Sequence, residues 1–352
     1  MIRVLIAEDS PTLRDLLVHV LESDPDIRVV GAVGNGEEAV GAARRLKPDV
    51  VTMDVHMPKM NGFEATRTIM ATQPVPIVVI SSTLKDQVAA TFEALEAGAL
   101  AFVRQPSGPL HDTDHEADVA ELLKTIKSMA EVKLVRRWAR AQGPAPLTGT
   151  AGRELGIAPA DIRVIAVGAS TGGPVVLQRI LSELAKGLSV PVLIVQHIAA
   201  GFSQGLAEWL ARSCNLPVEV AGDGVPALPG HVYLAPDDAH MGMGRNNRIS
   251  ISRGPAENGL RPAVSFLFRS VAETVGPHAV GILLTGMGRD GARELKLMKD
   301  RGAVTIAQDE QSSIVHGMPG EAVRLDAAGY VLSPEEIVTV LAGLLERDEP
   351  GP

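Results

Sequence analysis

The sequence predicts an α/β protein of two domains, each with a doubly wound, mostly parallel sheet. Three observations indicate this fold class. The length of 352 residues exceeds that of a usual single domain. Short apolar runs alternate with amphipathic helical stretches in both halves. A stretch rich in glycine and proline separates the halves. With 45% hydrophobic residues, the chain has ample apolar side chains for two packed cores.

In the first half, five short apolar runs predict strands with helical segments between them. The expected strands are Arg3–Ala7, Ile27–Val33, Val50–Asp54, Ile77–Ser81 and Ala101–Val103. A helix is expected from about His115 to Arg140, because apolar residues recur there at helical spacing. The alternation predicts a doubly wound (βα)5 domain over residues 1–130.

Residues 131–160 are expected to hold the end of this helix and a flexible linker, because glycine and proline recur between Gln142 and Ala160. Residues 161–347 are expected to form the second domain, a mostly parallel sheet with a β-hairpin made by Val232–Ala235 and Ile249–Ser252. The last residues, 348–352, are expected to form a disordered tail.

A serine stands in a tight turn after the first expected strand of the second half. The apolar run Val164–Val167 leads into Gly168-Ala169-Ser170-Thr171-Gly172-Gly173-Pro174. This stretch matches the Gly-x-Ser-x-Gly pattern found between a strand and a helix, where amides at the helix start face a developing oxyanion. Proline suits the first helical position. Ser170 is therefore the candidate nucleophile for acyl transfer.

Two later residues complete a candidate triad. His197 follows the apolar run Val190–Val195, and Asp290 lies just beyond the run Ala279–Leu284. In an open parallel sheet, these strand ends converge on one crevice. We expect Ser170 to attack, His197 to take and return the proton, and Asp290 to orient the imidazole and stabilise its cation.

Each of these residues also has a simpler interpretation. A Gly-x-Ser-x-Gly match alone is often only a tight turn, His197 alone fits a strand-end histidine bonded to a carbonyl, and Asp290 alone fits a helix cap. A dinucleotide-binding loop would need an acidic residue at the end of the next strand, where the chain has Gln196-His197. A phosphate-binding loop would need a lysine after the glycines. The three residues together favour an esterase.

Carboxylates end two of the strands expected in the first half. Glu8 and Asp9 follow the first strand and Asp54 ends the third, which predicts an oxygen site suited to Mg²⁺ at one sheet edge. With the metal in place, Asp54 is expected to accept a phosphoryl group. We expect Ser81 to hydrogen-bond that group and Phe102 to repack in response. Taken singly, each acid also fits a helix cap.

The composition argues against several protein classes. A formal net charge of −9 argues against a nucleic-acid scaffold, and the single cysteine, Cys214, excludes an internal disulfide. No uninterrupted apolar run is long enough for a transmembrane helix. The N-terminus is typical of a strand and not of a signal peptide. These features indicate a cytoplasmic protein.

Together, the motifs resemble a known family. Residues 1 to about 128 resemble a response-regulator receiver domain, and residues 161 to about 345 resemble the catalytic domain of the chemotaxis protein-glutamate methylesterase, CheB. The matching stretches are Gly168–Gly173, Gln196-His197, Leu228–Pro236, Arg261-Pro262, Thr285–Gly291 and Gly317–Pro319.

The resemblance implies that Ser170, His197 and Asp290 are the catalytic triad, and that Thr171 and Met287 line the site. It implies hydrolysis of glutamate γ-methyl esters, and deamidation of particular glutamines, on the cytoplasmic helices of chemoreceptors, without a cofactor. It also implies that the receiver covers the catalytic face until a histidine kinase of the CheA type phosphorylates it in the presence of Mg²⁺. No nucleic acid is an expected partner, and the membrane is approached only through the receptors.

One position departs from the receiver pattern. In receivers the fifth strand normally ends with a lysine before a proline, whereas this chain has Arg104-Gln105-Pro106. An ammonium would pair with the phosphoryl group, but a neutral amide only donates a hydrogen bond to it. Strand alternation points Arg104 to the opposite face. We therefore expect Mg²⁺ binding to persist and the response to phosphorylation to be weakened or rewired.

Two other functions stand as alternatives. The chain is then either a catalytically silent regulator, whose receiver controls a binding domain or acts as a phosphate sink, or a general serine esterase of the α/β-hydrolase type. The complete triad set argues against the first. The second is disfavoured because α/β-hydrolases run serine, acid, histidine along the chain, whereas this chain runs Ser170, His197, Asp290.

Overall fold

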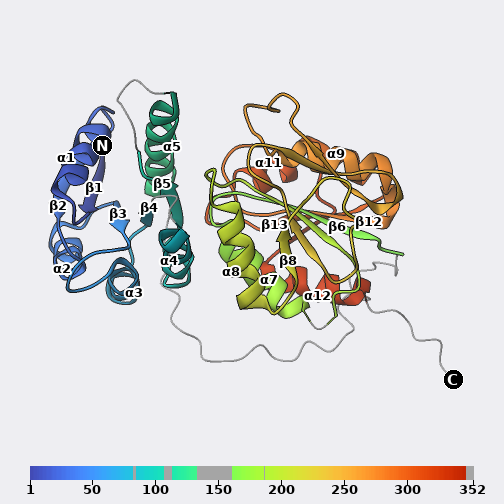
Figure 1. Cartoon of the computed structure of the whole chain (residues 1–352), viewed down its shortest axis with the longest axis horizontal. Helices are drawn as coiled ribbons and strands as arrows, with labels where there is room; N and C mark the ends of the chain where they lie inside the picture. The colour runs from blue at the N-terminus through green and yellow to red at the C-terminus, as the bar shows by residue number, and fades with distance from the viewer. Residues whose placement is uncertain (82–84, 107–112, 133–160, 186, 346–352) are drawn as a thin grey trace. The chain divides into compact units, whose positions relative to one another are not determined.

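A computed structural model of the chain describes residues 1–81, 85–106, 113–132, 161–185 and 187–345, although the side chains of residues 81, 85–90, 113 and 114 are not described. The chain divides into two compact units, Met1–Arg140 and Ala141–Pro352. Figure 1 shows that each unit has a central sheet with helices packed against it. Most of the expected linker (133–160) and all of the expected tail (348–352) lie outside the described residues.

The described part of the first unit alternates strands and helices along the chain. Its elements are β1 (Ile2–Ala7), α1 (Pro11–Glu22), β2 (Ile27–Val33), α2 (Gly36–Leu46), β3 (Val50–Asp54), α3 (Gly62–Thr72), β4 (Ile77–Ser81), α4 (Lys85–Glu96), β5 (Ala101–Arg104) and α5 (Thr113–Ala130). The strands pair in parallel in the order β2-β1-β3-β4-β5.

This strand order places helices on both faces of the sheet. The chain moves one way from β1 to β2 and the other way from β2 to β3, so right-handed crossovers put α1 and α2 on opposite faces. Helices α2, α3 and α4 pack in succession. Lys127 of α5 forms an ion pair with Asp24, just after α1. The predicted doubly wound (βα)5 fold is confirmed.

The helix expected up to Arg140 is shorter than predicted. It begins at Thr113 and ends at Ala130, where Glu131 and Val132 close the last turn with bonds to the carbonyls three residues before them. No glycine or proline marks this end, so the helix end carries none of the residues from which a stop is usually predicted. Residues 133–140 are outside the described part of the chain.

The second unit is built on a larger sheet. Its strands are β6 (Val164–Ala169), β7 (Val192–Gln196), β8 (Val218–Val220), β9 (Val232–Leu234), β12 (Ala279–Leu283), β13 (Val304–Gln308) and β14 (Tyr330–Leu332), all paired in parallel in the order β14-β13-β12-β6-β7-β9-β8. The strands β10 (His240–Met243) and β11 (Ile249–Ser252) form a separate antiparallel pair.

Helices cover this sheet in two groups. One group is α7 (Gly173–Leu184), α8 (Ser203–Cys214) and α12 (Pro334–Leu345), and the other is α9 (Val264–Thr274), α10 (Ala292–Asp300) and α11 (Met318–Arg324). The two groups lie on opposite sides of the sheet (Figure 1). Two short 3-10 turns, Arg245–Asn247 and Gly276–His278, complete the described elements. The predicted doubly wound, mostly parallel sheet is confirmed.

Two details of the second half differ from the prediction. The residues Val232–Leu234 do not form the hairpin but lie inside the parallel sheet, between β7 and β8, and the hairpin partner of Ile249–Ser252 is His240–Met243. Strands of three or four residues carry too little alternation to reveal their partner. Helix α7 begins at Gly173, so Pro174 is its second residue.

The side chain of Val264, the first residue of α9, packs closely against Gly168 and Gly291. A Cβ atom on Gly168 would lie 2.3 Å from Val264 Cγ1, and one on Gly291 would lie 2.4 Å from the same atom. Both positions therefore need glycine, and Gly291 also has a φ of 80°. This close approach brings the start of α9 against the residue before Gly291, which is Asp290.

Candidate functional site

The carboxyl edge of the second sheet brings the predicted catalytic residues into one region. Ser170 follows β6, His197 follows β7, and Asp290 lies beyond β12. Strand β6 is hydrogen-bonded to both β7 and β12. The strand order reverses between β6 and β12, and the crevice outside such a reversal is where open α/β sheets bind ligands.

The histidine and the aspartate are in direct contact. Nε2 of His197 lies 3.0 Å from Oδ2 of Asp290, and the two side chains are 12% and 3% exposed. The backbone amides of Val264 and Ser265, at the start of α9, donate to the two oxygens of the same carboxylate. Asp290 is thus a helix cap as well, but for α9 and not for α10, which follows it in the chain.

These contacts keep Asp290 ionised. Burial raises its pKa, but the hydrogen bond and the charge of His197, with the hydrogen bonds from Ser265 and Val264, outweigh burial, so the pKa of Asp290 is lowered overall. A charged carboxylate beside Nε2 stabilises an imidazolium when one forms. Because Nε2 faces Asp290, Nδ1 is the ring atom left to exchange a proton.

Ser170 is fixed through its backbone. Its amide donates to the carbonyl of Thr285 at 3.0 Å, and its carbonyl accepts from Gly173 N at 2.8 Å and from Gln196 Nε2 at 2.8 Å. The same Nε2 donates to the carbonyl of His197 at 2.8 Å. The buried side-chain amide of Gln196 therefore links the turn that carries Ser170 to the turn that carries His197. The Ser170 side chain is half-buried, and within the described residues its hydroxyl makes no hydrogen bond.

The two predicted site-lining residues flank Ser170. The carbonyl of Thr171 accepts from Thr285 Oγ1 at 3.0 Å, while its amide donates to no acceptor in the described part of the chain. This amide stands at the N-terminus of α7, where the helix dipole favours negative charge. Met287 is half-exposed. It follows Gly286, whose Cα approaches Ser170 so closely that an added Cβ would lie 2.6 Å from Ser170 Cβ.

Two residues outside the predicted site support it, Gln308 and His240. Gln308 is fully buried and accepts from Thr285 N at 2.8 Å, which holds the strand end that binds Ser170. His240 accepts at Nδ1 from Ala263 N, the residue before α9, and contacts the carbonyl of Pro255 through Nε2. These groups bond mainly to backbone atoms far along the chain, which leaves no spacing signal in the sequence.

The first unit gathers the predicted metal ligands. One oxygen from each of Glu8, Asp9 and Asp54 lies within 4.8 Å of the others. Burial and then the charge of Asp54 raise the pKa of Glu8 to about 7, and burial chiefly raises that of Asp54. Three close carboxylates that repel one another form a donor set of hard oxygens, which fits Mg²⁺. The structure therefore has the residues to hold that ion.

The predicted switch residues lie on β4 and at β5. Ser81 ends β4, opposite Arg104 on β5, but its side chain is outside the described residues. Phe102 packs edge-on against Phe92 of α4, with ring centroids 5.7 Å apart. Gln105 is half-buried just after β5. Arg104 pairs with Asp118 of α5 at 2.8 Å.

Comparisons with known proteins agree with this architecture. Residues 165–341 match the family model of the CheB methylesterase, and residues 4–111 match that of the response regulator receiver domain. The chain is similar to proteins named protein-glutamate methylesterase/protein-glutamine glutaminase from Nitrosospira multiformis (52% identity, 99% of both chains) and Syntrophus aciditrophicus (51% identity, 98% of both chains).

The second unit also resembles a solved structure. The CheB methylesterase catalytic domain of Thermotoga maritima is 35% identical, with a TM-score of 0.50, over 52% of this chain and 98% of that one. In the described part of the chain, no helix combines the length and the apolar character needed to cross a bilayer. From its relatives and both family models, this chain belongs to the CheB methylesterase family, with a response-regulator receiver domain preceding the methylesterase domain.

Proposed function

We propose that this chain is a protein-glutamate methylesterase of a chemosensory pathway, which hydrolyses glutamate γ-methyl esters on the cytoplasmic helices of chemoreceptors. The observation that carries the proposal is the His197–Asp290 pair beside Ser170 at the reversal point of the sheet. The names of the relatives support the same activity, and they extend it to the deamidation of glutamine side chains.

The reaction proceeds in two steps on the residues of this site. Ser170 Oγ attacks the ester carbonyl while Nδ1 of His197 takes its proton, and the amide of Thr171 stabilises the oxyanion. Collapse of the intermediate breaks the ester bond, and His197 returns the proton to the leaving methoxide, which departs as methanol. Water then attacks the acyl-enzyme with His197 as base, and this releases the glutamate carboxylate and restores Ser170. A glutamine side chain follows the same route and releases ammonia.

The receiver regulates this site in our proposal. Residues 1–130 form the receiver, 131–160 connect it to the catalytic domain at 161–347, and 348–352 form a tail. Glu8, Asp9 and Asp54 hold Mg²⁺, which supplies charge neutralisation for phosphoryl transfer. Asp54 accepts the phosphoryl group from a histidine kinase of the CheA type, and Ser81, Phe102 and Gln105 respond to it. On this proposal, the chain acts in the cytoplasm.

Methanol release tests the activity. Purified chain is added to methylated receptor membranes with Mg²⁺, with and without a small-molecule phosphodonor. Release that rises with the donor supports both the esterase and its control by the receiver. Release that is the same with and without the donor supports the esterase and contradicts its regulation by the receiver. Absence of release in both conditions favours the catalytically silent regulator.

A serine variant tests the nucleophile. Ser170→Ala is expected to lower methanol release by about a thousandfold or more, with an unchanged thermal midpoint. The matched control is Ser213→Ala in the last turn of α8, and it should retain full activity. Among the described residues, this hydroxyl bonds only within its own helix and to the adjacent Cys214. Full release by Ser170→Ala would refute the assignment of the nucleophile.

A further inference from the structure

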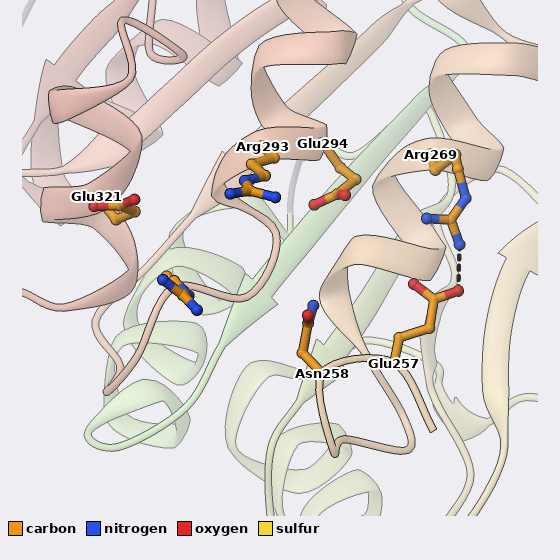
Figure 2. A pocket seen from close by; sticks show the side chains of 7 residues that line it. Glu257, Asn258, Arg269, Arg293, Glu294 and Glu321 are labelled. Atoms are coloured by element: carbon orange, nitrogen blue, oxygen red, sulfur yellow. Dashed lines mark hydrogen bonds and ion pairs between the residues drawn. The ribbon is translucent and has the colours of Figure 1, made fainter. Parts of the chain in front are cut away.

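A charged cavity of about 360 Å³ lies on the second unit, next to the catalytic pair. Its charged lining residues are Glu257, Arg269, Arg289, Arg293, Glu294 and Glu321. Figure 2 shows that Arg293 and Glu294 extend from α10, Glu321 from α11 and Arg269 from α9, while Glu257 comes from the loop before α9. The triad mechanism uses none of these side chains.

The cavity shares a wall with the catalytic pair. Arg289 directly precedes Asp290, so their Cα atoms are about 3.8 Å apart. Ser265 donates its amide to Asp290 Oδ1 and its hydroxyl to Glu257 Oε2, at 3.2 and 3.1 Å. Burial raises the pKa of Glu294, and the charge of Asp290 raises it further. The cavity therefore adjoins Asp290, the residue that contacts His197.

Beyond its paired charges, the cavity keeps two arginines, Arg289 and Arg293, against one acid, Glu294. Arg269 is hydrogen-bonded to Glu257, and Glu321 is held by Arg324 through two bonds of 2.7 Å. Arg289 and Arg293 are exposed, and in the described part of the chain neither has an ion-pair partner. The pKa of Glu321 is lowered by its bonds to Arg324 and also by the charges of these two arginines. Both guanidinium groups line the same cavity.

Another arginine near the site is already neutralised. Arg261 donates from Nε and Nη2 to Asp238 Oδ1, at 2.8 and 2.5 Å, and from Nη1 to the carbonyl of Gly254 at 2.9 Å. It thus has fewer donors left for a substrate than Arg289 or Arg293. Arg289 and Arg293 are the arginines of the cavity that have no ion-pair partner among the described residues.

We propose that Arg289 and Arg293 bind an acidic side chain of the substrate protein, located three or four residues from the esterified glutamate. The inference rests on the proposed function and names a recognition element for it. Guanidinium groups match carboxylates in shape and charge. On a substrate helix, side chains three or four residues apart stand about 5–6 Å apart, so an acid one turn from the ester reaches a cavity that adjoins the triad.

A charge exchange between enzyme and substrate tests this site. The full chain is assayed for methanol release, as kcat/KM, on two methylated cytoplasmic fragments of a chemoreceptor. One fragment keeps an acidic residue one turn from the ester, and the other has lysine there. Wild type is expected to prefer the acidic fragment by about tenfold. Arg293→Glu and Arg289→Glu are each expected to shift the preference toward the lysine fragment, a change that simple misfolding does not produce.

The control is Arg212→Glu, which reverses the charge of an exposed arginine in the last turn of α8. Helix C-termini lie at the sheet edge opposite the site in such a fold, so this variant should keep the wild-type preference. The inference alone is overturned if wild type hydrolyses both fragments and the Arg293→Glu and Arg289→Glu variants keep its preference. If wild type releases no methanol from either fragment, the proposed function fails and the inference fails with it.

Discussion

The backbone amide of Val264 donates to Oδ2 of Asp290 at 2.6 Å, and that oxygen also lies 3.0 Å from Nε2 of His197. The N-cap residue of α9, Ala263, makes no side-chain hydrogen bond to the first turn. The carboxylate of Asp290, which lies later in the chain, accepts the amides of that turn instead. The residue that orients the histidine is consequently held by a helix N-terminus, whose dipole favours its negative charge.

This arrangement predicts a double effect for Asp290→Asn. Both carboxylate oxygens accept backbone amides, so an asparagine must turn its NH₂ group toward one donor. We expect unfolding free energy to fall by about 1–3 kcal/mol and kcat to fall by about 10⁴-fold, as the imidazole loses its orienting charge. Urea unfolding and methanol release measure the two effects.

The control for that variant is Asp300→Asn at the end of α10. Asp300 is exposed, and its one ion-pair partner in the described part of the chain is Lys296, at 3.2 Å. The change should therefore cost less than about 1 kcal/mol and leave kcat unaltered. If Asp290→Asn proves as mild as Asp300→Asn in both measurements, the dual role of Asp290 is wrong.

Gly286→Ala tests the close packing under the nucleophile. The new Cβ would lie 2.6 Å from both Ser170 Cβ and Met318 Sδ, so the turn that carries Ser170 must shift. Because displacement of reacting groups by about 1 Å can cost about a hundredfold in rate, kcat should fall by that order while the chain still folds. Gly187→Ala is the matched control, since no atom of the described residues lies within 4 Å of its added Cβ. Equal activity of the two variants would contradict the packing argument.

Much of this site could be predicted because its parts obey local rules. The strand ends at Ser170, His197 and Asp54 carry their functional groups directly after apolar runs, and parallel sheets gather such ends at one edge. The order in which the strands pair could not be predicted from these rules. Val232–Leu234 is too short for its periodicity to separate a hairpin strand from an interior parallel strand.

The supporting contacts could not be predicted, for a different reason. Gln196 and Gln308 are buried amides that bond to backbone groups of other segments, and any buried polar residue requires some partner of this kind. Which partner it finds depends on the tertiary packing. The same holds for Arg289 and Arg293, because their availability for a substrate depends on which of the neighbouring charges are already paired with one another.

Metal binding by the receiver should depend on pH. Mg²⁺ requires ionised carboxylates, and the pKa of Glu8 is raised to about 7, so ion binding below pH 7 must displace a proton. We expect Mg²⁺ affinity to fall as pH decreases through about 7, with up to one proton released per ion near pH 6. Isothermal titration in buffers of different ionisation enthalpy measures both quantities. A constant affinity between about pH 5 and pH 8 would contradict this.

The metal-free receiver should show the opposite trend in stability. The folded pKa of Glu8 lies above the unfolded value of 4.5, so the native state binds the proton more tightly. The free energy of unfolding of the metal-free receiver should therefore decrease as pH rises from about 4.5 through 7, by up to about 3 kcal/mol. Glu8→Gln should remove most of this dependence and weaken Mg²⁺ binding. Glu37→Gln, at an exposed position of α2, should change neither.

Gln105→Lys is expected to strengthen the response to a phosphodonor. In wild type, position 105 carries a neutral amide where receivers usually have the ammonium of a lysine. Arg104 does not replace that ammonium, because it is paired with Asp118 on α5. A lysine at 105 can form a charge-assisted bond to a phosphoryl group on Asp54. The measurement is the ratio of methanol release with donor to release without it, and it should rise in the variant.

Gln73→Lys provides the same exchange at another half-buried glutamine of the receiver. It caps the C-terminus of α3, and in a parallel α/β unit helix C-termini lie at the edge of the sheet away from Asp54. A general effect of added positive charge would alter both variants alike, whereas a phosphoryl contact alters only Gln105→Lys. Strong activation of the wild type that Gln105→Lys leaves unchanged would mean that this receiver switches without a cation at that position.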